Sequence, residues 1–187
     1  TVYFPCGRIG LKGFFVDNKL PESCGHTVYG VYCENEKTYT IGEMLEKLPK
    51  EEMDVFQLNE LFCRFDKLPE EMQRVYDLTL QLKEPRNVKG MIDLMEHLSE
   101  VCVVNGIQNE RQLGEFLVEN ELFDVSFPDE VLPYLDYAKI GREHMQTHQG
   151  KLIQGAYVED TSTDNVNQFS QESNEENDQS DDYEMKL

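Results

Sequence analysis

The middle of the chain carries apolar side chains at the spacing of amphipathic helices. Between residues 53 and 68 they recur at intervals of three and four, which places them on one helix face and leaves Glu60 on the other. The same spacing recurs after Pro69, which suits the first turn of a helix because it has no N–H to donate, and after Asn87 and Asn109, whose side chains can cap a helix. The pattern therefore predicts a helical bundle. The expected inner positions are Leu58, Leu61, Phe62, Phe65 and Leu68, then Met72, Val75, Tyr76, Thr79 and Leu82, then Met91, Ile92, Met95, Leu98 and Cys102, and finally Leu113, Phe116 and Leu117.

The segment before the bundle has a different pattern. Residues 1 to 42 are dense in glycine and in aromatic and β-branched residues, which favours a small antiparallel sheet. Thr40 and Glu43 have the spacing of a capping box, in which each side chain accepts a hydrogen bond from the backbone N–H of the other residue. They predict a short helix that ends near Pro49.

The segment after the bundle mixes both patterns. Ser126 and Pro128 predict the start of a further helix that reaches Tyr137 or beyond, and residues 152 to 158 predict a closing strand. From Glu159 to Leu187 the chain is rich in Asn, Gln, Ser, Asp and Glu. Because this tail cannot bury enough apolar area to offset its ordering entropy, we expect it to be disordered.

These patterns together predict an α+β fold with a helical middle. We expect four segments along the chain. They are a small β-rich domain over residues 1–42, an acidic helical bundle over 43–108, a C-terminal α+β domain over 109–158 and the acidic tail over 159–187.

The charge balance narrows the possible partners. The chain has 17 Lys and Arg against 37 Asp and Glu, a formal net charge of −20. Residues 43 to 136 alone hold 22 acids against nine bases, a net charge of −13. Direct binding to DNA, RNA or an anionic membrane is disfavoured because all three have the same sign. A basic partner is favoured instead.

The same composition bears on where the protein resides. No run approaches the roughly 20 apolar residues that a membrane span needs, and the chain opens without a basic stretch that leads into an apolar one. Five cysteines, odd in number and irregularly spaced, are unlike a secreted disulfide framework. We expect a soluble, cytoplasmic protein. The cysteines are Cys6, Cys24, Cys33, Cys63 and Cys102.

No motif for catalysis or cofactor binding is present. Glycine-rich nucleotide-binding loops are absent. His144 and His148 stand four residues apart, as in zinc proteases, but those enzymes need Glu directly after the first His and this chain has Met145. We interpret the two histidines as exposed or capping residues, and we assign no catalytic residue, metal site or cofactor. A weaker alternative is an enzyme with zinc at the N-terminal cysteines and His26.

The folded region is unusual for the number and spread of its acids. Duplex DNA presents about one negative charge per 1.7 Å of axis, so the 27 carboxylates of residues 1 to 158 match about 46 Å of duplex in number. Their net charge of −11 matches only about 19 Å. Composition alone favours an ordinary acidic surface kept for solubility.

A resemblance to a known family favours DNA mimicry over solubility. Residues 134 to 143 resemble, at the same spacing, the Tyr-x-Asp-Tyr-x-x-x-Gly-Arg-Asp segment of the ArdA antirestriction proteins, with Glu143 in place of the last Asp. Residues 58–61 and 68–71 are similar to the Leu-Asn-x-Leu and Leu-Pro segments that open the helical middle of that family. The matching motif residues are Tyr134, Asp136, Tyr137, Gly141, Arg142 and Glu143.

The resemblance implies a protein of mobile genetic elements, such as conjugative transposons, that imitates DNA. It would occupy the DNA-binding groove of Type I restriction-modification enzymes as an elongated homodimer, and it would act as an inhibitor rather than an enzyme. The motif would lie in the third domain, where the nearly even charge suits a self-association or structural segment better than a mimic surface. We predict that outward acids of the middle helices form the mimic surface. They are Glu60, Asp66, Glu70, Glu71, Asp77, Asp93, Glu96, Glu100, Glu115 and Glu119. The alternative is an acidic interaction module that binds another basic DNA-binding protein.

Overall fold

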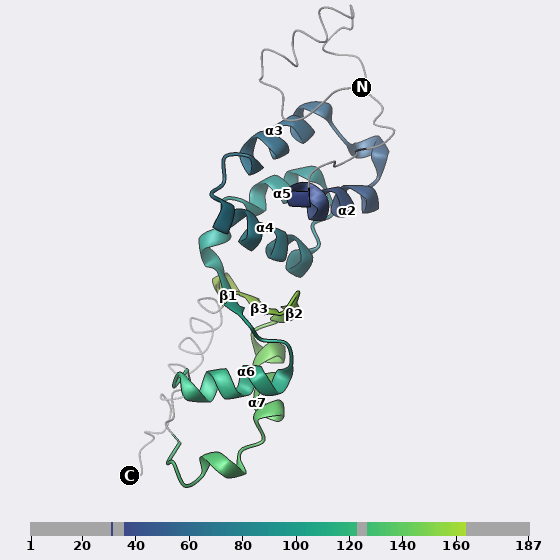
Figure 1. Ribbon diagram of the computed structural model, residues 1–187. Helices are drawn as coiled ribbons and strands as arrows, with labels where there is room; N and C mark the ends of the chain where they lie inside the picture. The colour runs from purple at the N-terminus through teal and green to yellow at the C-terminus, as the bar shows by residue number, and fades with distance from the viewer. Residues whose placement is uncertain (1–30, 32–35, 123–126, 164–187) are drawn as a thin grey trace, which may run out of the picture.

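The computed structural model describes residue 31 and residues 36–122 and 127–163. Within these residues the fold is α+β, with six α-helices and one three-stranded antiparallel sheet, which confirms the predicted class. The described part is elongated, with a helical bundle at one end, the sheet in the middle and two helices at the other end (Figure 1). The sheet expected in residues 1 to 42 lies almost entirely outside the described residues.

Four helices form the bundle. They are α2 (Tyr39–Lys47), α3 (Val55–Phe65), α4 (Glu70–Lys83) and α5 (Val88–Leu94). Short 3-10 turns at Glu36–Thr38 and Lys50–Glu52 flank α2, and a third at Leu98–Glu100 follows α5. The bundle encloses one apolar core, whose fully buried centre includes Ile41, Leu45, Leu61, Tyr76 and Met91. Tyr76 satisfies its hydroxyl there by donating to the backbone oxygen of Met91 over 2.8 Å.

Local signals placed most of the helix starts correctly. Asn87 caps α5 by accepting from the backbone N–H of Gly90, and Asn109 caps α6 (Glu110–Glu119) by accepting from that of Gln112, as predicted. The capping box at Thr40 is wrong, because α2 already begins at Tyr39 and Thr40 is buried inside it.

The predicted helix that included Cys102 is wrong in its second half. Helix α5 ends at Leu94, and Cys102 belongs to strand β1 (Val101–Asn105). The predicted closing strand is a hairpin, with β2 (Lys151–Ile153) and β3 (Ala156–Asp160) joined by Gln154 and Gly155, both at positive φ. The strand order is β1-β3-β2, so β1 joins the C-terminal strands rather than the bundle.

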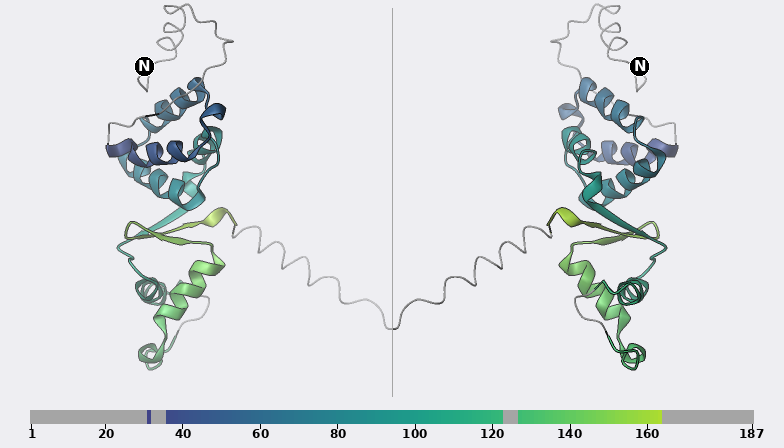
Figure 2. Two further views of the ribbon diagram at one scale, coloured as in Figure 1. Left: turned by 90° about the vertical axis from the view of Figure 1, so that its right-hand side faces the viewer. Right: turned by 90° about the vertical axis from the view of Figure 1, so that its left-hand side faces the viewer.

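The sheet packs on helices through both faces. On one face Val103 and Val158 belong to a cluster with Leu78 and Leu82 of α4, which ties the sheet to the bundle. On the other face Tyr157 packs with α6 and with α7, which spans Tyr137–Thr147. Figure 2 shows the sheet between the bundle and the α6–α7 pair from both sides. Because alternate residues of β3 point to opposite faces of the sheet, this strand contacts both the bundle and the α6–α7 pair.

Helices α6 and α7 (Tyr137–Thr147) cross at very short range. A Cβ atom on Gly114 would lie 1.9 Å from the backbone oxygen of Tyr137, and one on Gly141 would lie 1.9 Å from that of Glu110. Only glycine permits this approach of two backbones. The predicted helix start at Pro128 is wrong, because the chain forms turns and a 3-10 segment at Leu132–Tyr134 before α7 begins; Ser126 lies outside the described residues.

Residues 159–163 are part of the fold, although the sequence places them in the tail. Strand β3 runs through Asp160, and a 3-10 turn follows at Thr161–Thr163. The Thr161 hydroxyl donates to the backbone oxygen of Glu100 over 2.8 Å, and Lys83 of α4 forms an ion pair with Asp160. Disorder from Glu159 onward is therefore wrong for residues 159–163, and residues 164–187 lie outside the described residues. No helix in the described part of the chain combines the length and apolar character needed to cross a membrane.

Candidate functional site

Most of the acids predicted for the mimic surface are on the outside of the helices. Seven of the ten are exposed, and Glu100 and Glu115 are partly buried. The exposed seven are Glu60, Asp66, Glu70, Glu71, Asp93, Glu96 and Glu119. They come from α3, α4, α5 and α6 and from the turns that follow α3 and α5, so the structure spreads them over several elements rather than gathering them in one pocket.

Asp77 does not belong to this surface. It lies on α4 beside buried Tyr76, and its Oδ1 atom is buried without a hydrogen-bond partner among the described residues. Burial raises the pKa of Asp77 to about 6. The prediction of an outward Asp77 is therefore wrong, because its place on α4 turns the carboxylate partly towards the protein.

One arginine holds two of the predicted acids. Arg64 of α3 contacts Glu60 one turn earlier at 2.7 Å and Glu96, in the turn after α5, at 2.7 Å. Hydrogen bonding to Glu96 is the main cause that raises the pKa of Arg64. The arrangement fixes the side chains of two elements and leaves a net charge of −1 at this point.

Further acids are paired within the chain. Lys37 contacts Glu70 at 2.9 Å, Lys89 contacts Asp93 at 2.9 Å, and Arg111 contacts Glu115 at 2.8 Å. Glu100 lies 3.3 Å from the ring of His97. Each Lys or Arg reduces the negative potential that its partner presents to solvent. Asp66, Glu71 and Glu119 form no ion pair with any described residue, so they present their full charge.

The residues of the ArdA-like motif mostly hold α7 against α6. Asp136 caps α7 by accepting from the backbone N–H of Lys139 over 3.1 Å. Tyr137 donates to the backbone oxygen of Leu132 over 3.0 Å and so fixes the preceding 3-10 turn. Gly141 permits the close crossing with α6 described above. These motif positions therefore have structural roles.

The charged end of the motif also bridges these two helices. Arg142 donates through Nε and Nη2 to one carboxylate oxygen of Glu110, over 3.0 and 2.7 Å. Hydrogen bonding from Arg142 is the main cause that lowers the pKa of Glu110. Glu143 lies 3.7 Å from Lys139 one turn earlier, within α7. The pairs keep this part of the chain close to neutral.

Tyr134 differs from the rest of the motif because 86% of its surface is exposed. Leu122 and Val131, in the same connection between α6 and α7, are 54% and 41% exposed. The part of this connection that follows residue 126 lies at the end of the described molecule opposite the bundle (Figure 1). It also contains exposed Asp129 and Glu130, so exposed apolar and acidic side chains lie close together in the sequence here.

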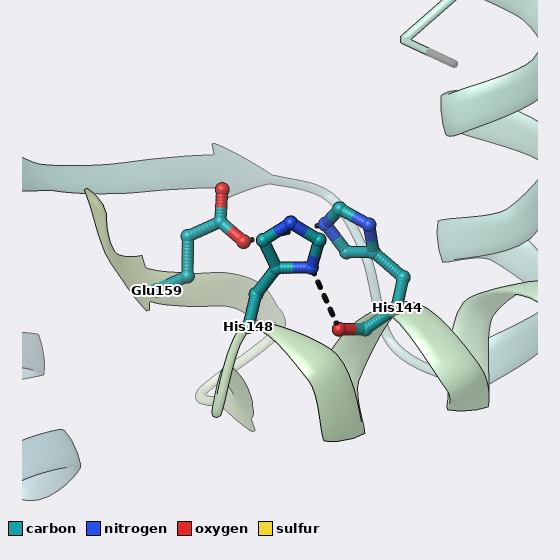
Figure 3. A group of neighbouring side chains, drawn as sticks. All are labelled: His144, His148 and Glu159. Carbon is teal, nitrogen blue, oxygen red and sulfur yellow. Dashed lines mark hydrogen bonds and ion pairs between the residues drawn. The ribbon is translucent and has the colours of Figure 1, made fainter. Parts of the chain in front are cut away.

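The structure also gathers a group that the sequence does not reveal. The rings of His144 and His148 on α7 stack with centroids 4.0 Å apart, and Nε2 of His144 lies 3.2 Å from a carboxylate oxygen of Glu159 on β3 (Figure 3). His144 and Glu159 are each only 13% exposed, so the expectation of an exposed His144 is wrong, whereas His148 does stand at the C-terminal cap of α7. The spacing of the histidines was visible in the sequence, but Glu159 was assigned to the tail.

Comparison with known proteins adds no relative. No protein-family model matches the chain, and a search of curated proteins finds no match. The link to the ArdA family therefore stays a prediction that rests on three short segments and on the acidic composition.

Proposed function

We propose that this protein mimics DNA and competitively occupies the DNA-binding groove of Type I restriction-modification enzymes. The observation that carries the proposal is that each of the six described α-helices presents at least one exposed carboxylate along an elongated body. One example from each helix, in chain order, is Glu43, Glu60, Glu70, Asp93, Glu119 and Glu143. A groove that binds a linear array of phosphates is suited to such an array of carboxylates.

The mechanism of inhibition is competition for Lys and Arg in the groove. Carboxylates held on packed helices are preorganised, so binding costs less ordering entropy than a flexible acidic segment would. Long-range attraction between the acidic protein and the basic groove accelerates encounter and falls with ionic strength. Carboxylates that already hold a Lys or Arg of this chain contribute less than Asp66, Glu71 and Glu119.

The proposal includes a homodimer that doubles the acidic length. Its support is that three apolar side chains of the connection between α6 and α7, Leu122, Val131 and Tyr134, are exposed. Burying such side chains against a second copy is favourable, because each apolar Å² removed from water contributes roughly 25 cal/mol. Analytical ultracentrifugation should show a dimer that Tyr134→Ala weakens.

A plating assay tests the function directly. A host with a Type I system expresses the protein and is challenged with unmodified phage, and plating should rise to the level of a host without restriction. Unchanged restriction at good expression would reject the proposal. In vitro, binding to the purified methyltransferase should weaken steeply with salt and be competed by duplex DNA.

Two triple variants test whether the unpaired acids dominate. The variant D66N/E71Q/E119Q removes three carboxylates without internal partners, whereas the control E60Q/D93N/E115Q removes three that contact Arg or Lys of the same chain. Both change the net charge by the same amount. Three exposed pairs contribute about 0.6 to 3 kcal/mol together, so the first variant should bind the methyltransferase about 3- to 150-fold more weakly and the control should lose less. Equal losses would mean that only total charge matters.

The exposed apolar group favours one alternative. Phosphate mimicry does not need Leu122, Val131 or Tyr134, but a surface that binds another basic DNA-binding protein does use apolar contacts beside acids. In that case the plating assay would show full restriction, and Tyr134→Ala would weaken capture of that protein without changing the oligomeric state.

A further inference from the structure

Three potential metal ligands converge between α7 and β3. His144 and His148 are four residues apart, so both project from one side of α7, and Glu159 projects from the neighbouring strand (Figure 3). One ligand atom from each residue lies within 4.8 Å of the other two. This group is independent of the acidic helix surfaces and has no part in the function proposed above.

The surrounding hydrogen bonds prepare these side chains for a cation. Nδ1 of His148 lies 3.0 Å from the backbone oxygen of His144, and because a carbonyl can only accept, Nδ1 carries the proton and Nε2 keeps its lone pair. The Tyr157 hydroxyl donates to Glu159 over 2.6 Å and orients the carboxylate. Histidine and carboxylate ligands of metals are oriented by such outer hydrogen bonds.

The charge balance of the group also favours a cation. Glu159 is largely buried, and no Lys or Arg of the described residues contacts it. A largely buried carboxylate that no Lys or Arg contacts is compensated best by a positive ion.

We propose that His144, His148 and Glu159 form a Zn²⁺ site, with Nε2 of each imidazole and one carboxylate oxygen as ligands and water at the fourth position. Zinc prefers nitrogen and carboxylate ligands at about 2.0 to 2.2 Å in a tetrahedron, whose ligand atoms are then about 3.3 Å apart. Nε2 of His144 and Oε2 of Glu159 are already 3.2 Å apart. The ion would replace their direct hydrogen bond, with the Nε2 proton of His144 released to solvent, and would join α7 to the sheet.

Titration of the metal-free full chain with Zn²⁺ tests the site. We expect one Zn²⁺ per chain, a higher melting temperature with Zn²⁺, and a loss of affinity at pH 5, because protons compete with the metal for its ligands. His148→Gln and Glu159→Gln should each reduce affinity at least about 100-fold, since changes to outer-shell partners alone cost 10- to 100-fold. His97→Gln is the matched control, because His97 also lies near a glutamate but belongs to the bundle, and it should bind as the parent does.

Two results would overturn the site. One is the absence of saturable Zn²⁺ binding, and the other is equal affinity in the parent and in H144Q/H148Q. Co²⁺ in place of Zn²⁺ separates this site from the N-terminal cysteines, because thiolate ligands add charge-transfer bands that nitrogen and oxygen ligands lack, and such bands would likewise count against it. Should a ligand variant fail to fold, Tyr157→Phe keeps all three ligands and should still weaken Zn²⁺ binding about 10-fold.

Discussion

Asp77 shows how the position of one carboxylate on a helix sets its effect on stability. It is half-buried on α4 with a pKa of about 6, above its ordinary value of 3.8. The folded protein therefore holds this proton more tightly than the unfolded chain does. Stability from the protonated form is present below pH 4, is lost as the pH rises from about 4 to 6, and stays lost above that.

Asp77→Asn should consequently stabilise the protein at pH 8 and change little at pH 4. The expected gain is about 1 to 2 kcal/mol at pH 8, reduced from the full value because solvent reaches part of the side chain. Urea unfolding at the two pH values measures it. Asp66→Asn is the control, because Asp66 is exposed. If Asp77→Asn gave the same gain at both pH values, the role of burial would be contradicted.

Gly141 is a second position where adding one atom would change the stability of the protein. A Cβ there would meet the backbone oxygen of Glu110 at 1.9 Å, and a backbone atom cannot turn away as a side chain can. Gly141→Ala should cost about 3 kcal/mol by forcing α6 and α7 apart. The control is Gly90→Ala in α5, where the nearest atom is a side-chain oxygen at 3.3 Å, and it should change the free energy of unfolding by less than about 1 kcal/mol. Equal effects in thermal or urea unfolding would contradict the crossing.

At the scale of elements, local chemistry explains which predictions succeeded. Asn87 and Asn109 were correctly identified as caps because the interaction spans only three residues. Thr40 has the same type of signal but lies in a helix that starts one residue earlier, so its capping group is unused. A local motif indicates where a helix can start, and packing then selects among the possible starts.

Strand β1 could not be predicted locally because its partner is 55 residues away. Val101, Cys102, Val103 and Val104 form a continuous apolar run, which fits a buried strand as well as the end of a helix. The strand is defined only by pairing with β3, as in Val103 opposite Val158. The His144, His148 and Glu159 group depends on the same pairing, since β3 positions Glu159. Most of the exposed acids could be predicted, because the local spacing of apolar residues shows which face of a helix is outward. The His144, His148 and Glu159 group could not, because it depends on long-range pairing.

Asp136 offers a test at the scale of one element. It caps α7 and also belongs to the ArdA-like motif, so its role is either structural or electrostatic. Asp136→Ala should destabilise the protein by about 1 kcal/mol, whereas Asp136→Asn should retain stability, because Asn is an equally good capping residue. Thermal unfolding measures both. Equal destabilisation by the two variants would show that the charge, and not the cap, matters here.

At the scale of the whole molecule, the sheet fixes the position of α6 and α7 relative to the bundle. Alternate residues of β3 contact opposite sides, with Val158 towards α4 and Tyr157 towards α6 and α7. Lys151 reinforces the bundle side by donating to the backbone oxygen of Leu82 over 3.2 Å. Exposed carboxylates on α3 and on α6 are therefore held on one connected scaffold, which is what competition with a stiff duplex requires.

The acidic C-terminal segment provides a whole-molecule test of where mimicry resides. Residues 164 to 187 contain eight acids and one base, a net charge of −7. If the helix surfaces are the inhibitor, a chain that stops after Thr163 should protect unmodified phage as the full chain does, because it keeps every carboxylate of the described helices.

The stopping point matters, because Glu159 and Asp160 belong to the fold. A chain that stops after Val158 loses the ion pair of Asp160 with Lys83 and the contacts of Glu159 with His144 and Tyr157, so it should unfold at a lower temperature. Phage plating and thermal unfolding of both shortened chains separate the two effects. The chain that ends at Thr163 could lose protection while its melting temperature stays unchanged. In that case the DNA-mimicking charges would lie in the acidic segment and not on the helices.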